Sequence, residues 1–371
     1  MRKFFEQPID WVILIITILL ITVGAVTIYT ITFANNGTSL ALSQAMFGIF
    51  GLILLIVFMF TDYRQLGNYS WIIFILTLAL LVPLLPFWAS KIPFVLKVFG
   101  AHRWLDFGVI QFQPAEILKL TAAIFAAKFI ASKEGNVKPI TLIVYLLITI
   151  VSFGLIVLQP DLGTASVVLV VMSSIFLASR PSYKLLLSLT IIVLILLPTL
   201  YSNLKPYQVR RVQTFLNPGS DPQGAGYNVS QAIIAVGSGG LMGKGFGQGS
   251  QTVLNFLPVP HADFIFAGYA EATGFIGSSF LVLLYFVLVY RSVNIARDST
   301  DLFGKYLAIG IASKFAFQSF VHIGMNIGIM PVTGIPLPFM SYGGTALVID
   351  MASIGILQSI NIRHHMAKYK S

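Results

Sequence analysis

Long apolar runs follow one another along almost the whole chain, separated by shorter polar connections. Each run is close to the roughly 18 to 25 residues that a helix needs to cross a bilayer core about 30 Å thick. The runs expected to span a membrane are 11–31, 43–60, 70–88, 114–131, 139–158, 164–179, 184–201, 263–290, 304–329 and 341–362. The pattern therefore predicts an all-α integral membrane protein with about ten transmembrane helices, in which residues 1–371 form a single polytopic domain.

The one long polar break in this pattern is the segment 202–262, between the seventh and eighth predicted spans. It is too long for a simple connection, and it holds ten of the chain's 31 glycines. We therefore expect a large extracellular loop here. Its glycine-rich run from Gly237 fails as a nucleotide phosphate loop, because Ser238 stands at the first glycine position and Gly245 replaces the required Ser or Thr. The glycines either bring the backbone close to a ligand or form the turns of an irregular loop.

Composition and charge agree with the membrane class and indicate an orientation. Hydrophobic residues make up 57% of the chain, charged residues 10%, and the mean hydropathy is +0.87. An even number of spans places both termini on one side, and short loops rich in Lys and Arg stay cytoplasmic. Fourteen basic residues fall on the side of the termini, so both termini are expected in the cytoplasm. The basic residues of the opposite side are Lys91, Lys97, Arg103, Lys205, Arg210, Arg211 and Lys244.

Residue usage also excludes several kinds of chemistry. The net charge of +10 is mostly an orientation signal, with a lesser role for the outer basic residues in binding an anionic substrate, so nucleic acid is not an expected partner. The chain has no cysteine, which excludes disulfides and thiolate catalysis. Its five histidines lack the helical spacing of metal ligands apart from the pair His364 and His365, which fits a basic tail, so no zinc site is expected.

Ionisable residues inside the spans are few, and each is a candidate for function because a charge in lipid is costly. Asp263 lies at the mouth of the eighth span. Glu271 follows it about 12 Å further along the helix, where it could line the same cavity. Glu116 and Lys119 share one face of the fourth span, where they either pair with each other or offer both charges to a cavity.

Lys314 and Asp350 form a second group of buried charges. They fall at similar depths in the ninth and tenth predicted spans, which are antiparallel neighbours. We expect them to touch and to form an ion pair that fixes the packing of the two helices.

Six sequence blocks, in order along the chain, resemble a known family. They are GAHRWLDFG from Gly100, QPAEILKL from Gln113, QPDLGTA from Gln159, FLNPGSDPQGAGYNVSQAIIAVGSGGLMGKG from Phe215, HADFIFA from His261 and GMNIGIMPVTGIPLPFMSYGG from Gly324. Together they resemble the SEDS family of shape, elongation, division and sporulation proteins over nearly the whole chain. The first and third blocks are more similar to the elongation branch than to the division branch.

The resemblance implies a peptidoglycan glycosyltransferase that polymerises lipid II, the undecaprenyl-pyrophosphate-linked disaccharide peptide, at the outer face of the bacterial cytoplasmic membrane. A class B penicillin-binding protein is the implied partner, beside other cell-elongation proteins. Asp263 matches the essential aspartate of the family. The chain departs from the family at two acidic positions, since Val259 and Ala272 stand where relatives commonly carry glutamate.

This chemistry needs a base for the attacking sugar hydroxyl and cations for the departing pyrophosphate. We expect Asp263 to be the base, because partial burial at a helix mouth raises the proton affinity of a carboxylate, and Lys119 to be the main cation. The α-linked donor and β-linked polymer of the implied pathway require inversion in one displacement. No cofactor is required, although a divalent Mg or Mn ion could bridge a carboxylate and the pyrophosphate. The substrate-binding candidates are Arg103, Trp104, Glu116, Arg210, Arg211, Lys244 and Glu271.

Other functions fit part of the sequence. A flippase or transporter for lipid-linked precursors would explain the buried charges and the Gly and Pro residues between Gly324 and Gly344. It explains less well a carboxylate at the outer mouth beside a glycine-rich loop. A non-catalytic scaffold for cell-wall enzymes would leave Asp263 without a role. Within the family, a division or sporulation paralogue is the alternative to an elongation protein.

Overall fold

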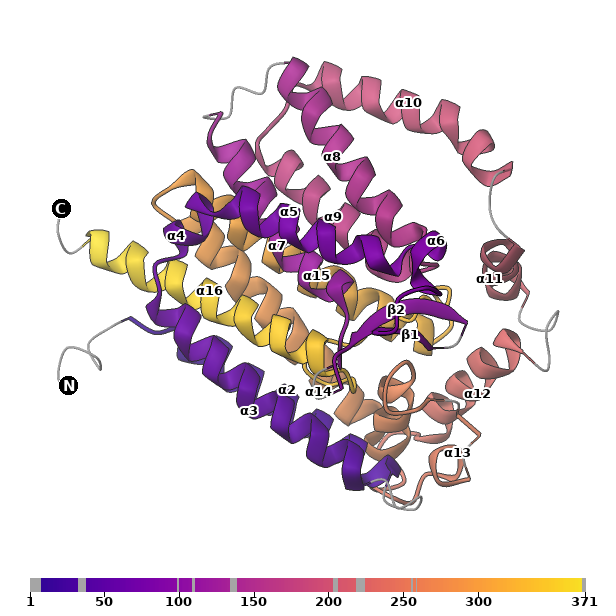
Figure 1. The fold of residues 1–371 in the computed structure, drawn as a ribbon. Coiled ribbons are helices and arrows are strands. Elements are labelled where there is room, and N and C mark those ends of the chain that lie inside the picture. Colours follow the sequence, from indigo (N-terminus) through magenta and orange to yellow (C-terminus); the bar gives the residue numbers. More distant parts are fainter. Residues whose placement is uncertain are drawn as a thin grey trace.

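A bundle of long helices makes up most of the protein (Figure 1). The computed structural model describes residues 8–32, 38–98, 100–108, 111–133, 139–202, 206–217, 224–254, 256–257 and 259–368. Each predicted span overlaps one long helix. These helices are α2 (Trp11–Thr32), α3 (Thr38–Phe60), α5 (Ser70–Leu81), α7 (Pro114–Ala131), α8 (Pro139–Val157), α9 (Leu162–Ala178), α10 (Tyr183–Ser202), α14 (Ile265–Asp298), α15 (Leu302–Asn326) and α16 (Gly344–Lys368).

The lengths of these helices support a multi-pass membrane protein. In the part of the chain that the structure describes, α2, α3, α8, α14, α15 and α16 are long and apolar enough to cross a membrane, and α5, α9 and α10 contain shorter apolar stretches. Helix α7 is less apolar because it carries Glu116, Lys119 and Lys128. The chain is therefore a multi-pass membrane protein, as predicted, and the figure of about ten crossings stays a prediction.

Helix α5 is shorter than the span predicted at 70–88. Pro83 and Pro86 lack the backbone N–H groups that would continue the helix. The chain instead forms a 3-10 turn, η2 (Val82–Leu84), and a short helix, α6 (Pro86–Ala89). Helix α4 (Tyr63–Asn68) makes the connection before α5.

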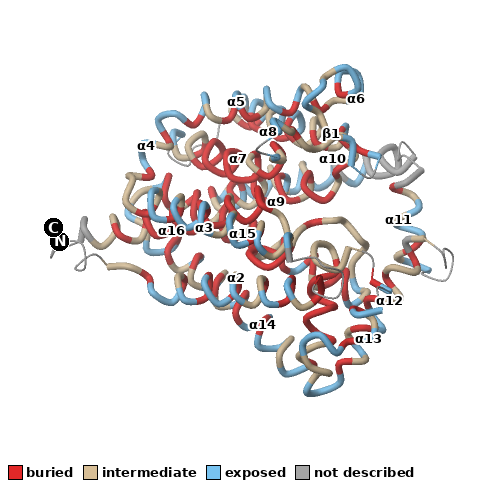
Figure 2. The backbone as a smooth tube through the Cα atoms, turned by 60° about the horizontal axis from the view of Figure 1, so that its bottom comes forward, coloured by how far each residue is buried: buried red, intermediate tan, exposed pale blue. Residues whose placement is uncertain are grey.

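The centre of the bundle is built from α7, α9, α15 and α16, which carry much of the buried backbone in Figure 2. In α16, 83% of the most apolar stretch is buried, against 17% in α3, so α16 lies inside and α3 faces outward. Lipid is as apolar as leucine, so these helices gain from close packing rather than from hiding apolar surface. Small residues allow the approach: a Cβ on Gly355 would lie 2.5 Å from the carbonyl oxygen of Leu55.

The end of the bundle opposite the termini is covered by short elements (Figure 1). Strands β1 (Val95–Val98), β2 (Ala101–Asp106) and β3 (Gln111–Phe112) form an antiparallel sheet in that order. Beside it lie α11 (Pro206–Leu216), α12 (Ala225–Ser238) and α13 (Ser250–Val253). The sheet is an addition to the predicted all-α fold, and the predicted loop 202–262 contains these three helices.

Candidate active site

Asp263 lies in a turn, residues 260–264, that leads into α14. Three consecutive carbonyl oxygens of this turn accept hydrogen bonds from the end of α15 and from the segment between α15 and α16. The pairs are Tyr342 N to His261 O at 2.8 Å, Ser341 Oγ to Ala262 O at 2.8 Å and Asn326 Nδ2 to Asp263 O at 3.1 Å. The backbone under Asp263 is therefore held by residues that are far away in the sequence.

The Asp263 carboxylate is half-buried at this turn. Among the residues that the structure describes, none forms a hydrogen bond or ion pair with it. Burial raises the pKa of the Asp263 carboxyl above its ordinary value, while the nearby Arg211 and Arg103 lower it and Asp161 raises it. A raised pKa suits a group that accepts a proton, and the role of Asp263 as the base stays a prediction.

Arg103 reaches this area from a β-bulge in the sheet. Leu96 pairs with Trp104 and Lys97 with His102, so Arg103 is the extra residue of β2, and such a bulge re-aims its side chain. Its Nε donates to the carbonyl oxygen of Gln159 at 3.2 Å and its Nη2 to that of Pro160. Arg103 thus ties the sheet to the start of α9. Trp104 is half-buried beside it.

Asp161 is an acidic residue of this area that the sequence did not single out. It caps the start of α9, since its carboxylate accepts from Thr164 N at 3.0 Å and from Gln113 Nε2 at 3.1 Å. The position of Asp161 three residues before Thr164, at the start of an apolar run, is the usual signature of an N-cap. The same residue interacts electrostatically with Asp263.

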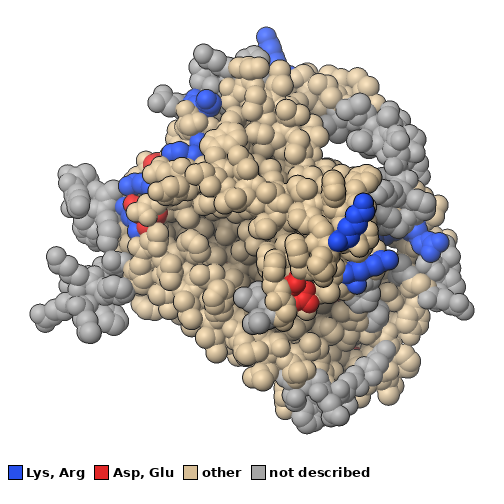
Figure 3. Space-filling view, viewed as in Figure 1, with Lys and Arg blue, Asp and Glu red and all other residues tan. Residues whose placement is uncertain are grey.

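The two arginines of α11 have different environments. Arg210 is exposed and Arg211 is half-buried, with its Nη1 3.5 Å from the carbonyl oxygen of Thr333. Thr333 packs on the start of α9, because a Cβ on Gly163 would lie 2.6 Å from the same carbonyl oxygen. Arg211 therefore belongs to the area around Asp263. Basic side chains gather on this end of the molecule in Figure 3.

Glu116 and Lys119 form an ion pair with each other in the first turns of α7. Both side chains are buried, with Lys119 0% exposed and Glu116 2% exposed. Of the two alternatives that the sequence left open, the structure favours the pair over charges that are offered to a cavity. The role of Lys119 as a cation for pyrophosphate stays a prediction.

Lys314 and Asp350 also form a buried ion pair, which confirms the predicted contact. Lys314 Nζ lies 2.9 Å from Asp350 Oδ1 and donates to Ser353 Oγ at 2.7 Å. Lys314 is close enough to Glu116 and Lys119 to interact with both. The two pairs are thus neighbours in the packed centre of the bundle.

Glu271 is directed to the glycine-rich segment rather than to Asp263. Its buried carboxylate accepts from Lys244 Nζ at 3.0 Å, from Gln251 N at 3.0 Å and from Thr252 N at 3.1 Å. The expectation that Glu271 lines the cavity of Asp263 is not supported by these contacts. It rested on helical rise, and Asp263 lies in a turn before the helix starts. Glu271 and Lys244 instead fasten α13 and the glycine-rich segment to α14.

The glycine-rich segment fills a break in α14. Gly274 has φ 67° and ψ −163°, which interrupts the helix and frees backbone groups on both sides. Gly245 N donates to Ala272 O at 2.9 Å, and Phe275 N donates to Gly240 O at 2.8 Å. A Cβ on Gly243 would lie 2.2 Å from the same Ala272 oxygen. These glycines therefore bring the loop close to the protein's own backbone, where its hydrogen bonds satisfy groups that the break in α14 frees.

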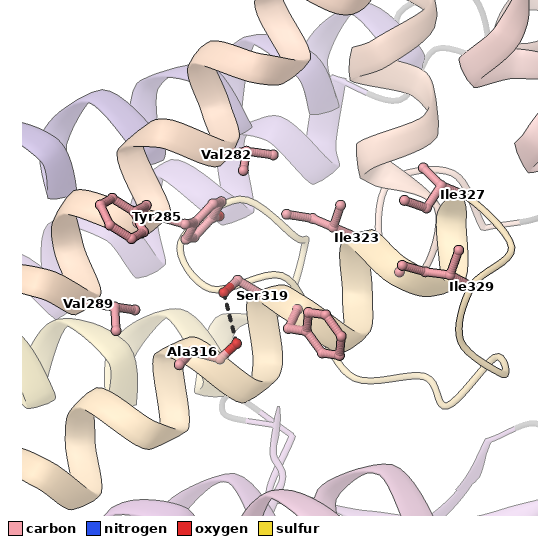
Figure 4. Close-up of a pocket in the computed structure, with 11 residues that line it drawn as sticks. Val282, Tyr285, Val289, Ala316, Ser319, Ile323, Ile327 and Ile329 are labelled. Atoms are coloured by element: carbon pink, nitrogen blue, oxygen red, sulfur yellow. Dashed lines mark hydrogen bonds between the residues drawn. The ribbon is translucent and has the colours of Figure 1, made fainter.

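A pocket of about 280 Å³ lies between α14 and α15, and no Asp, Glu, Lys or Arg side chain lines it. Figure 4 shows its side chains pointing into the space between the two helices. Its lining is almost wholly apolar, with Val282, Tyr285, Ala316, Phe320 and Ile323 among its residues. It offers no acid, base or cation for chemistry. Nor do the described residues contain a group of three or more His, Cys, Asp or Glu side chains that could hold a metal ion.

The comparisons with known proteins agree over nearly the whole length of the chain. A family model described as a cell cycle protein, covering FtsW, RodA and SpoVE, matches residues 8–366. The chain is 37% identical over 375 residues to the peptidoglycan glycosyltransferase MrdB of Escherichia coli (strain K12), covering 98% of this chain and 97% of that protein. It is 35% identical over 368 residues to stage V sporulation protein E of Bacillus subtilis (strain 168), covering 95% and 96%.

Solved structures show the same similarity. One belongs to a peptidoglycan synthase complex, studied for its structural coordination of polymerization and crosslinking. It matches with a TM-score of 0.81 and 28% identity, covering 96% of this chain and 99% of that chain. The rod shape determining protein RodA of Thermus thermophilus matches with a TM-score of 0.70 and 26% identity, covering 96% and 97%.

Proposed function

The chain belongs to the cell cycle protein family of FtsW, RodA and SpoVE, and we propose that it is a peptidoglycan glycosyltransferase that polymerises lipid II. The observation that carries the proposal is Asp263. Its half-buried carboxylate is held at a fixed turn beside two arginines, and no described residue pairs with it. The similarity to RodA, the rod shape determining protein, favours a role in elongation.

The reaction joins two lipid-linked sugars. The oxygen of the acceptor hydroxyl forms a bond to the anomeric carbon of the donor, while Asp263 accepts the proton of that hydroxyl. The bond between that carbon and the pyrophosphate oxygen breaks, and its electron pair leaves with the pyrophosphate. One displacement inverts the anomeric centre, so the polymer is β-linked when the donor is α-linked. A positioned base contributes about 10²- to 10⁴-fold to such a step.

The negative charge that develops on the pyrophosphate must be offset by cations. Arg103 and Arg211 are the best placed, since both interact with Asp263. Both already donate to backbone carbonyls, but a guanidinium group carries five N–H donors, which leaves others for phosphate oxygens. Arg210 is exposed on the same helix as Arg211. Trp104 offers a ring against a sugar. Lys119 would have to leave Glu116 to take part, which makes it the weaker candidate.

The active site faces outward in this proposal. The two ends of the chain lie at one end of the bundle, and α11 and β2 lie at the other (Figure 1). Asp263 interacts with Arg211 of α11 and Arg103 of β2, which places it with the latter. Fourteen of the 23 basic residues fall on the side of the termini, which by the positive-inside rule is cytoplasmic. The substrate would then be polymerised at the outer face of the bacterial cytoplasmic membrane.

The proposed partner is a class B penicillin-binding protein, as the similarity to a peptidoglycan synthase complex suggests. We propose that a transmembrane helix of this partner packs over the apolar pocket between α14 and α15 described above, which forms an apolar groove on the surface of the bundle (Figure 4). Ala316→Phe would fill the groove and should reduce co-purification of the partner. Gly154→Phe on α8, where a Cβ would meet nothing within 4 Å, is the matched control and should leave co-purification unchanged. Equal recovery with both variants would contradict this placement.

A divalent Mg or Mn ion remains a proposal for this site. Asp263 offers the carboxylate oxygen that such ions prefer, and the substrate pyrophosphate would have to supply most of the other ligands, since the described residues hold no ligand cluster. When bound, the ion would supply charge stabilisation to the pyrophosphate. Polymer yield measured with excess chelator, and again after adding back Mg or Mn, tests the requirement.

The decisive experiment is polymerisation of lipid II by the purified chain in detergent, with and without the partner. We expect polymer from the wild type and a loss on the order of a hundredfold or more for Asp263→Asn, which keeps the size of the side chain but removes the proton acceptor. A well-folded Asp263→Asn that makes normal amounts of polymer would refute the role of the base. Translocation of lipid II across vesicles without any polymer would indicate a flippase instead.

A further inference from the structure

Helix α14 begins without a side-chain cap of its own. Its N-cap residue is Phe264, which makes no side-chain hydrogen bond to the first turn. The first four N–H groups of a helix have no partner within the helix, and Ser, Thr, Asp or Asn at the N-cap would normally accept one of them. Phenylalanine has no acceptor. One of these N–H groups nevertheless has a hydrogen-bond acceptor, which belongs to another helix.

Asn326, the last residue of α15, supplies that acceptor. Its Oδ1 accepts from Ala267 N at 3.1 Å, and its Nδ2 donates to Asp263 O at 3.1 Å and to His322 O at 2.8 Å. The side chain is 0% exposed. A flipped amide would place its NH₂ group against an N–H and its oxygen against two carbonyls, so the partners fix its orientation. A single amide thus joins α15 to both the first turn of α14 and the turn that carries Asp263.

We propose that Asn326 is a positioning residue for Asp263, acting as an N-cap of α14 supplied by a neighbouring helix and as a clamp on the Asp263 carbonyl. This inference rests on the proposed function of Asp263 as the base. A misplacement of about 1 Å at a reacting group can cost on the order of 10²-fold in rate. The amide therefore affects turnover through the place of the carboxylate, without touching the substrate.

Two substitutions separate the halves of this role. Asn326→Leu removes both the acceptor and the donors. Asn326→Asp keeps an acceptor for Ala267 N, but its second oxygen faces the carbonyl oxygens of Asp263 and His322. At most one of the two donor contacts of the amide therefore survives, through the O–H of a protonated carboxyl. Asn361→Leu is the control, because that asparagine likewise donates to a backbone carbonyl, Pro8 O at 2.7 Å, at the end of the bundle that carries the termini.

The readouts are steady-state polymerisation of lipid II and hydrogen–deuterium exchange of the backbone at 261–270, both on the full chain in detergent. We expect kcat to fall roughly 10- to 100-fold in both Asn326 variants with KM changed less than about threefold, because the base is misplaced while the substrate contacts remain. Exchange at 261–270 should speed up in Asn326→Leu and less in Asn326→Asp. Asn361→Leu should match the wild type in both measurements.

The outcomes distinguish the inference from the function on which it rests. An active wild type with normal kcat in both Asn326 variants overturns the inference and leaves the proposed function intact. A wild type that makes no polymer with or without a partner removes the proposed function. In that case the hydrogen–deuterium exchange data still test whether Asn326 holds the Asp263 turn. Unchanged exchange at 261–270 in Asn326→Leu would refute that role.

Discussion

Removing one partner of the Lys314–Asp350 pair should destabilise the bundle far more than replacing both. The ammonium and carboxylate are 2.9 Å apart and each residue is at most 2% exposed. Lys314→Met strands the carboxylate, and Asp350→Leu strands the ammonium. Breaking a buried pair in this way costs about 3 to 5 kcal/mol, whereas replacing both charges by apolar residues of similar volume is often neutral or stabilising.

The surrounding contacts refine this magnitude. The Ser353 hydroxyl donates a hydrogen bond to Ile349 O at 2.7 Å and accepts one from Lys314 Nζ at 2.7 Å. The Lys314 ammonium therefore keeps one polar partner in Asp350→Leu. In Lys314→Met, no other described residue donates a hydrogen bond to the Asp350 carboxylate. We therefore expect Lys314→Met to be the more damaging single change, towards the upper end of the range for a broken pair.

Thermal unfolding in detergent at a fixed scan rate provides the double-mutant cycle. The double variant should lose much less stability than the sum of the losses of the two single variants. The surface pair Arg297–Asp298, at 3.8 Å with side chains 83% and 55% exposed, is the control, and exposed pairs of this kind contribute about 0 to 1 kcal/mol. Losses that add within about 0.5 kcal/mol would show that Lys314 and Asp350 act independently, and would reopen an ion or proton pathway through the bundle.

Three further predictions test the polar groups around the site. Lys119→Met should reduce turnover strongly if Lys119 is a catalytic cation, whereas recovery of polymer synthesis in Lys119→Met combined with Glu116→Gln would show a structural pair. Activity should fall as pH drops through the pKa of Asp263, which burial raises; Arg211→Met removes a cation that lowers this pKa, so the acid limb of the pH–rate profile should move to higher pH. Gly243→Ala should cost more stability than the about 1 to 2 kcal/mol expected for a left-handed alanine, since its Cβ would lie 2.2 Å from a backbone oxygen. Its melting temperature should therefore fall below that of Gly240→Ala, the control with nothing within 4 Å, and equal losses would contradict the clash.

The apolar pattern predicted the helices because each run is long and the helical rise sets its length. The same geometry predicted the Lys314–Asp350 contact, since both residues lie inside regular helices whose depths can be counted. The sheet was not predicted, because β3 has only two residues. The break at Gly274 was not predicted either, because one glycine inside an apolar run is compatible with a continuous helix. Whether the helix breaks there depends on the contact with the glycine-rich segment, which the sequence does not report.

The candidate site was predicted unevenly for the same reason. Asp263 could be singled out because a carboxylate at a helix mouth is costly, whatever it contacts. The assignments that failed to fit, such as Glu271 beside Asp263, relied on extending a helix into a turn. Asn326 acts through hydrogen bonds to backbone groups of a distant segment, and Asp161 accepts from the distant Gln113 side chain. No periodicity in the sequence reports which segments meet.

The missing acidic residues at Val259 and Ala272 are compatible with the proposed reaction. A glycoside hydrolase needs a second carboxyl group because its leaving alcohol must be protonated. Pyrophosphate leaves as a stable anion, so the departing group needs cations rather than a proton, and Arg103 and Arg211 interact with the site already. Asp161 already raises the pKa of Asp263, and a further carboxylate close by would raise it more and reduce the ionised fraction at neutral pH. In the proposed reaction, one base beside two guanidinium groups is therefore enough for a single inverting displacement.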